Sequence, residues 1–199
     1  MRFRFGFKSC NRPAVANAKV DTFAGDERGT TGLEFALVVG PFLFLLFGIM
    51  SVGLYFFVMF SLEHAVESAA RLVRTGQAQS ATAPMTVDDF KAQVCSRLPS
   101  FMNCSGAGNK IRINVQTYAG YGSVTVPSCV DSSGALIAST AQTYNPGGAS
   151  TIVLVSACYE WELGNALANV PYWISPANAK MTNGSTLIQA STTFTTEPF

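Results

Sequence analysis

The chain has 199 residues, a formal net charge of +1 and a hydrophobic fraction of 48%. This length suits one modest domain with extensions, and its few, dispersed basic residues exclude a basic patch for nucleic acid. Most of the excess hydrophobicity lies in the run 35–60, and the remainder has the composition of an ordinary small soluble domain.

Residues 1–29 show no sustained helix or strand period and have the character of a leader. Six basic and three acidic residues give this leader a net charge of +3, whereas seven basic and nine acidic residues give residues 30–199 a net charge of −2. Because the basic flank of a membrane span stays in the cytoplasm, we expect a basic cytoplasmic leader and an exported C-terminal part.

The run from Phe35 to Phe60 contains 26 residues without a formal charge, nearly all of them apolar. A bilayer core about 30 Å thick needs roughly 20 helical residues, so the run can span it with some tilt. The alternatives are a buried helix of a soluble protein and a secretory signal that is removed whole. The run is long for a signal, whose apolar region has about 7–15 residues, and the small residues at 68–70 lie inside a continuing helical pattern.

The helical pattern continues beyond the apolar run. Its apolar residues recur at spacings of four, three and four, on one helical face: Leu62, Val66, Ala69 and Val73. Gly76 is a typical C-terminal stop, and Pro41 predicts a kink in the first turns. We therefore expect a long helix over 30–76 that crosses the membrane at about 35–60 and is amphipathic in water beyond.

Residues 77–199 predict an exported α+β domain with a short helix and a small antiparallel sheet. Thr86 opens the short helix and Pro99 ends it, with Val87, Phe90, Val94 and Leu98 on one face. The period then changes to two, which is typical of half-buried strands. The strands expected are 111–118, 151–159, which is apolar on both faces and therefore central, 187–195, and a shorter candidate, Ser123–Val126. The stretches 127–150 and 164–184 are rich in turn residues and are expected to be loops.

Cysteine usage fits this topology. Cys10 lies in the leader, and four cysteines lie in the exported part: Cys95, Cys104, Cys129 and Cys158. An even count in an oxidising compartment favours two disulfides, and of the three pairings we choose Cys95–Cys104 with Cys129–Cys158, which closes the shortest loops. A four-thiolate metal site is the alternative, but the chain has no CxxC motif and its one histidine is far from the cysteines in sequence.

The junction between leader and apolar run reads Gly29-Thr30-Thr31-Gly32-Leu33-Glu34-Phe35. A glycine, four residues, then Glu and an aromatic residue resembles the class III signal of type IV-like prepilins in the Flp/Tad branch. The stretch 27–38, the segment 63–71 and the last residues, 195–199, resemble TadE-like minor pseudopilins in particular. The small major pilins of this branch have almost nothing after the helix, so the 123 residues after Gly76 favour a minor or accessory subunit.

The resemblance implies a pilin-like α+β protein of the bacterial inner membrane with one span and an extracytoplasmic C-terminal domain. It also implies cleavage between Gly29 and Thr30 by a prepilin peptidase, and roles in pilus assembly for Glu34 and Phe35. The cut creates an α-ammonium on Thr30, and Glu34 of a neighbouring subunit can neutralise it and fix axial register. The implied partners are the membrane, the peptidase, other pilins or pseudopilins and the assembly platform, with no cofactor, small-molecule substrate or nucleic acid.

Three alternative interpretations remain open. Glu34 can instead be an interfacial carboxylate that stabilises the N-terminus of the helix. The protein can be an uncleaved, membrane-anchored periplasmic binding or scaffold domain. It can also be an enzyme that uses His64 as a base between Glu63 and Glu67, but no nucleophile motif accompanies His64, and the pair Asp88-Asp89 suits a helix N-terminus better than acid–base chemistry. We therefore expect no enzymatic activity.

Overall fold

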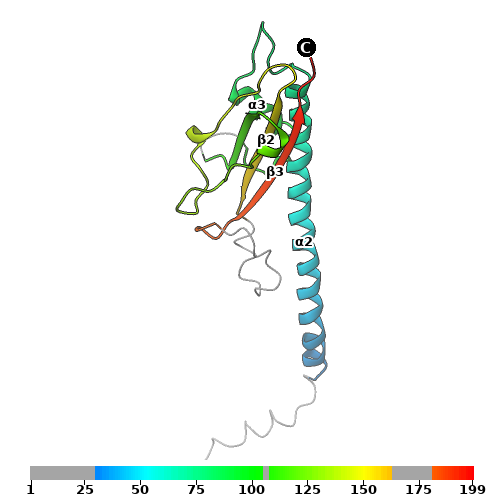
Figure 1. The fold of residues 1–199 in the computed structure, drawn as a ribbon. Helices are drawn as coiled ribbons and strands as arrows, with labels where there is room; N and C mark the ends of the chain where they lie inside the picture. The colour runs from blue at the N-terminus through cyan, green and yellow to red at the C-terminus, as the bar shows by residue number, and fades with distance from the viewer. Residues whose placement is uncertain (1–29, 105–107, 163–180) are drawn as a thin grey trace, which may run out of the picture. The chain divides into compact units, whose positions relative to one another are not determined.

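The computed structural model describes residues 30–104, 108–162 and 181–199 (Figure 1). The predicted leader, 1–29, and most of the predicted loop 164–184 lie outside these residues. The predicted α+β class is confirmed: a long N-terminal helix is followed by a short helix and a three-stranded antiparallel sheet. In chain order the elements are α2 (Thr30–Arg74), α3 (Val87–Cys95), β1 (Ile111–Tyr118), the 3-10 helices η2 (Tyr121–Ser123) and η3 (Ser139–Ala141), β2 (Ile152–Trp161) and β3 (Thr186–Thr195).

Helix α2 is assigned without interruption through Pro41. It ends at Arg74, and Gly76 has a φ of 75°, a left-handed conformation that glycine adopts without steric cost. A boundary between two compact units of the chain lies between residues 47 and 48, within α2. Its residues 31–47 are almost all exposed, and the helix is long and apolar enough to cross a membrane.

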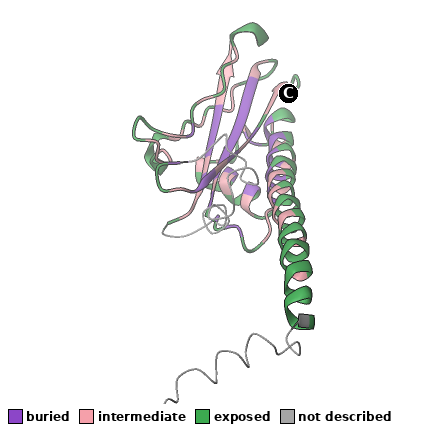
Figure 2. Ribbon diagram, turned by 90° about the horizontal axis from the view of Figure 1, so that it is seen from below, coloured by how far each residue is buried: buried purple, intermediate pink, exposed green. Residues whose placement is uncertain are grey.

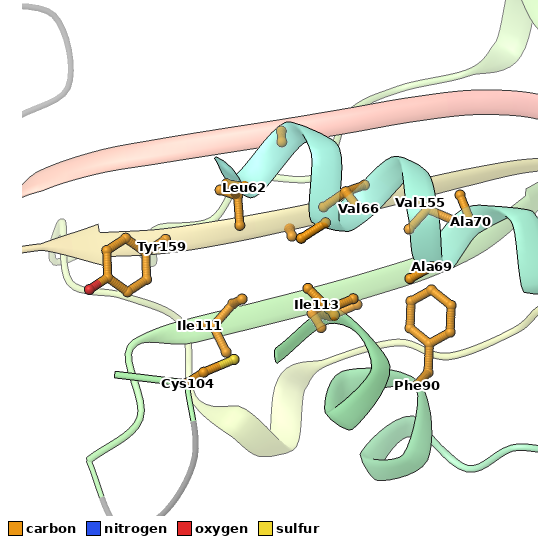
Figure 3. Packing of buried hydrophobic residues seen from close by; sticks show 14 of the residues in the cluster. Leu62, Val66, Ala69, Ala70, Phe90, Cys104, Ile111, Ile113, Val155 and Tyr159 are labelled. Atoms are coloured by element: carbon orange, nitrogen blue, oxygen red, sulfur yellow. The ribbon is translucent and has the colours of Figure 1, made fainter. Parts of the chain in front are cut away.

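The second half of α2 belongs to the folded domain. Its apolar stripe is buried against the sheet: Val58, Leu62, Ala65, Val66, Ala69, Ala70 and Val73 are each at most 4% exposed. Figure 3 shows Leu62, Val66, Ala69 and Ala70 facing Ile111, Ile113 and Val155 of the strands. The alanines allow the helix to approach the sheet closely, and each larger side chain contributes about 1.5–3 kcal/mol by leaving water. This is the stripe that the sequence period predicts.

The strand order is β1-β2-β3, and both neighbouring pairs are antiparallel. Val115 of β1 lies opposite Val155 of β2, and Ala157 of β2 lies opposite Ala190 of β3. Since side chains alternate along a strand, this register gathers the buried apolar residues on the face that meets α2. They are Ile111, Ile113, Val115, Val153, Val155, Ala157, Tyr159, Trp161, Ile188 and Ala190.

Nearly every residue of β2 is buried, so the central strand is covered on both of its faces, as its sequence predicts (Figure 2). The Cys129–Cys158 disulfide joins the loop 127–150 to β2. The backbone N–H of Thr143 donates to the Asn114 side-chain oxygen at 2.9 Å, and Asn114 is itself buried. This bond gives the buried Asn114 side chain a partner, and together with the disulfide it holds the loop on the sheet.

Helix α3 begins with a capping box in which Thr86 and Asp89 bond each other's backbone N–H groups. The bond from the Thr86 backbone lowers the pKa of Asp89 below its usual value. The helix ends at Cys95, three residues before the predicted end at Leu98. Pro99 disfavours helical geometry at Leu98, and the amides of Arg97 and Leu98 instead close tighter turns onto Val94 and Cys95.

The predicted short strand Ser123–Val126 is wrong. The backbone N–H and hydroxyl of Ser123 both donate to the Gly120 carbonyl, at 3.1 and 2.8 Å, and form a 3-10 turn in place of a strand. The Tyr118 hydroxyl donates to the Thr125 carbonyl at 2.7 Å, and Pro127 has no N–H to offer a neighbouring strand. Local hydrogen bonds therefore outcompete sheet pairing here.

Candidate processing and assembly site

The predicted assembly residues lie in the first turns of α2. The helix begins at Thr30, whereas Gly29 and the side chain of Thr30 lie outside the described residues. Glu34 is the fifth helical residue, one turn beyond Thr30 and on the same face, since positions i and i+4 are neighbours on a helix. A group at the start of the helix and the Glu34 carboxylate are therefore within reach of each other along the helix surface.

Glu34 is exposed within an apolar surface. Its neighbours Leu33 and Phe35 are 65% and 68% exposed, and Leu37 and Val38 beyond them are similarly exposed. Among the described residues no ion pair involves Glu34. An unpaired carboxylate amid apolar side chains is costly to place in lipid or in a protein interface, so burial of Glu34 in either setting would require a positive or hydrogen-bonding partner.

The helix dipole accounts poorly for Glu34. The first turn of α2 contains no acidic residue, and the attraction of a helix N-terminus for negative charge falls off within that turn. Glu34 lies just past it. The structure therefore weakens the interpretation in which this carboxylate serves only its own helix.

The far end of α2 is joined to the C-terminal residues of the chain (Figure 1). The backbone N–H of Glu197 donates to the Arg74 carbonyl at 2.9 Å, and the two side chains form an ion pair at 3.5 Å. The Phe199 ring lies so close to Gly76 that a Cβ added there would be 2.5 Å from its atoms. We call residues 196–199 the C-terminal clasp, because they give a helix-end carbonyl a partner and cover the glycine that ends the helix.

Thr196 anchors the clasp to the sheet. Its side chain is 2% exposed, and its hydroxyl accepts from the Thr151 backbone N–H at 2.8 Å while lying 2.7 Å from the Gly148 carbonyl. The Thr196 N–H in turn donates to the Thr151 carbonyl at 2.9 Å. The last residues of the chain therefore connect β3, the start of β2 and the end of α2.

The four cysteines of the folded domain form two disulfides, Cys95–Cys104 and Cys129–Cys158, with Cα–Cα distances of 5.6 and 6.0 Å. This arrangement fits the pairing chosen from the short loops. The first bond ties the end of α3 to the segment that leads into β1, and the second ties the loop 127–150 to β2. No cluster of three or more His, Cys, Asp or Glu side chains that could hold a metal is found in the described parts of the chain.

His64 lines a shallow surface pocket together with Ser61, Arg97 and several apolar residues. A serine and a histidine in one pocket raise the question of a catalytic pair, but the Ser61 hydroxyl donates to the Phe57 carbonyl of its own helix at 2.7 Å. This bond is typical of serine within a helix. The pocket therefore shows no activated nucleophile.

Comparison with known proteins finds a family match that falls on the long helix. A model of the family described as TadE-like protein matches residues 29–71. This part of the chain is TadE-like. Its described residues lie wholly within α2, from the exposed apolar half through most of the buried stripe. No curated protein and no solved structure matches the chain significantly.

Sequence reasoning placed Glu34 and Phe35 on one helix but missed two features of the folded domain. One is the clasp, because the contact between residues 74–76 and 196–199 depends on the whole sheet lying between them in sequence. The other is the grouping of Arg97 and Phe101 with Phe57 of α2. The one signal for this grouping in the sequence is Phe101, an aromatic residue two positions after Pro99.

The clasp yields a stability prediction. Gly76→Ala places a side chain at φ 75° and against the Phe199 ring, and the left-handed backbone alone costs about 1–2 kcal/mol. We expect a lower midpoint of thermal unfolding for the full-length protein in detergent. Gly120→Ala is the matched control, since Gly120 is extended and has nothing within 4 Å of an added Cβ. Equal midpoints for the two variants would contradict the clasp.

Proposed function

We propose that this TadE-like protein is a pseudopilin: a precursor in the bacterial inner membrane that a prepilin peptidase cleaves between Gly29 and Thr30, and that then takes part in assembly of a Tad/Flp, or type IVb, pilus. The TadE-like match over residues 29–71 supports it. So does α2, whose residues 31–47 form an exposed apolar rod suited first to lipid and then to packing against other subunits.

The observation that carries the proposal is the position of Glu34. Glu34 is the only acidic residue in the exposed apolar half of α2, and it lies one turn beyond the expected cleavage site. Cleavage gives Thr30 a free ammonium. When helices pack side by side, an unpaired ammonium and an unpaired carboxylate are each costly to bury, whereas pairing them between neighbouring subunits lowers both costs. The pair also fixes how far one helix slides along the next.

The proposed topology follows from charge and redox chemistry. The leader carries +3 and the remainder carries −2, a difference that favours a cytoplasmic leader by the positive-inside rule. The domain with two disulfides then lies outside the cytoplasmic membrane, where such bonds persist. The proposed partners are accordingly the peptidase, other pilins or pseudopilins and the assembly platform.

An uncleaved anchored scaffold is the second candidate. The observation that favours it is that residues 58–73 of α2 form part of the folded core, so that the domain is fixed directly to its span. Such a protein needs no processing and keeps residues 1–29. The mature N-terminus therefore separates the two candidates.

We expect the mature protein, purified from its native membrane, to begin Thr30-Thr31-Gly32. The peptidase accepts a glycine before the bond because it lacks a side chain and can enter a tight site. N-terminal sequencing or intact-mass measurement decides this. A mature protein that starts at Met1 would favour the anchored scaffold. One that starts beyond Gly53 would exclude the pseudopilin interpretation.

The assembly role of Glu34 has its own test. Glu34→Gln keeps the side-chain shape but cannot neutralise an ammonium, and breaking a buried ion pair costs about 3–5 kcal/mol. We expect normal membrane insertion and cleavage, with loss of piliation and of co-purification with other pilus subunits. The matched control is Glu63→Gln, an exposed glutamate on the same helix beyond the apolar run. Normal piliation with Glu34→Gln at equal protein levels would exclude the intersubunit pair.

A further inference from the structure

Aromatic residues mark the end of the apolar run on α2. Counting from Phe35, a hydrocarbon core about 30 Å thick ends near residue 54, and each headgroup layer adds about 5–7 Å, or about three to five helical residues. Tyr55, Phe57 and Phe60 therefore fall in or next to the outer headgroup layer. Aromatic side chains are enriched at this level of a membrane.

The sheet domain reaches the same level of α2 through two aromatic contacts. The Trp161 ring, at the end of β2, lies 5.8 Å from the Tyr55 ring, and the Phe101 ring lies 6.2 Å from the Phe57 ring. Both contacts lie within the unit 48–199. The end of β2 and the turn after Pro99 are thereby held beside the part of α2 that leaves the hydrocarbon.

Beside these contacts the domain has an exposed surface that is apolar and basic. The shallow pocket there is lined by Phe57, Phe60, Ser61, His64, Arg97, Leu98 and Pro99, none of which is acidic. Phe57, Phe60 and the adjacent Phe101 are 52%, 61% and 51% exposed. We call these residues together the basal patch. Arg97 is exposed and makes no ion pair with any described residue.

We propose that the basal patch docks on the outer surface of the membrane that α2 crosses, with Arg97 bound to the phosphate of an anionic lipid headgroup. Three observations favour lipid as the occupant: the patch is continuous with the end of the span, its exposed rings suit the interface, and its charge complements phosphate. A guanidinium binds phosphate oxygens in a bidentate manner. The proposal rests on the membrane placement of α2, not on cleavage or pilus assembly.

Docking would move the exposed phenylalanine rings from water to the membrane interface. Three large rings that are half exposed on one small surface would be unfavourable in water, whereas they fit the boundary between headgroups and acyl chains. The docked domain would have its base in the headgroup layer and its clasp at the opposite, membrane-distal end of α2.

The test is hydrogen exchange of the full-length protein in lipid nanodiscs, read by mass spectrometry with reduction of the disulfides at quench. We expect the segment 96–103 to exchange about fivefold more slowly in discs that contain phosphatidylglycerol than in phosphatidylcholine discs, the effect of one basic residue at an anionic surface. Arg97→Gln should abolish this difference. The matched control, Arg71→Gln, removes an exposed arginine near the other end of α2 and should preserve it.

Two results would overturn the proposal. One is equal exchange of 96–103 in both kinds of disc, or a phosphatidylglycerol effect that survives Arg97→Gln. The other is protection that follows the number of protein copies in a disc and is independent of lipid charge, which would make the basal patch a contact between copies of this chain. Because the readout uses the isolated protein, neither result depends on whether the protein assembles into a pilus.

Discussion

One buried stripe on one helix holds this architecture together. Three antiparallel strands form too small a sheet to be stable unless something covers its apolar face, and α2 supplies that cover with residues from Val58 to Val73. The first half of the same helix suits a different environment, the lipid of a membrane, because residues 31–47 expose apolar side chains almost throughout. A single element is thus both the apolar anchor and a major part of the domain core.

Because α2 is both the apolar segment and part of the domain core, the proposed pairing of Glu34 between subunits is mechanically linked to the folded domain. Because the stripe is part of the core, a shift of α2 along its axis would disturb the packing of Leu62 and Val66 against β1 and β2. The clasp opposes the same movement at the other end, where Glu197 and Phe199 contact Arg74 and Gly76. If Glu34 sets the axial register of neighbouring helices, it also sets the relative positions of their folded domains, because each domain is fixed to its own α2.

The features that local sequence could predict are those with local causes. The buried stripe, β1, and the two-sided burial of β2 follow from hydrophobic period and strand composition, and the capping of α3 from Thr86. The disulfide pairing followed from loop length. By contrast, Ser123–Val126 has a strand-like composition, but its hydrogen bonds to Gly120 and from Tyr118 depend on the exact turn after β1.

Features that join distant segments were not predictable from one sequence. The clasp brings residue 76 against residue 199, and the basal patch brings Phe101 to Phe57; both contacts exist only after the sheet has packed on α2. The TadE-like match stops at residue 71, so it describes the helix and leaves the sheet domain without a template. For that domain, the contacts themselves are the guide to function.

We expect the stripe of α2 and the sheet to form one cooperative unit. Native-state hydrogen exchange of the full-length protein in nanodiscs tests it, with Leu62→Ala as the perturbation and Leu45→Ala, at a 60% exposed site on the same helix, as the control. Leu62→Ala is expected to lower the opening free energies of residues 62–74 and of β2 by the same amount, about 2–5 kcal/mol. Loss of protection in β2 while residues 62–74 keep theirs would show that the helix and the sheet unfold as separate units.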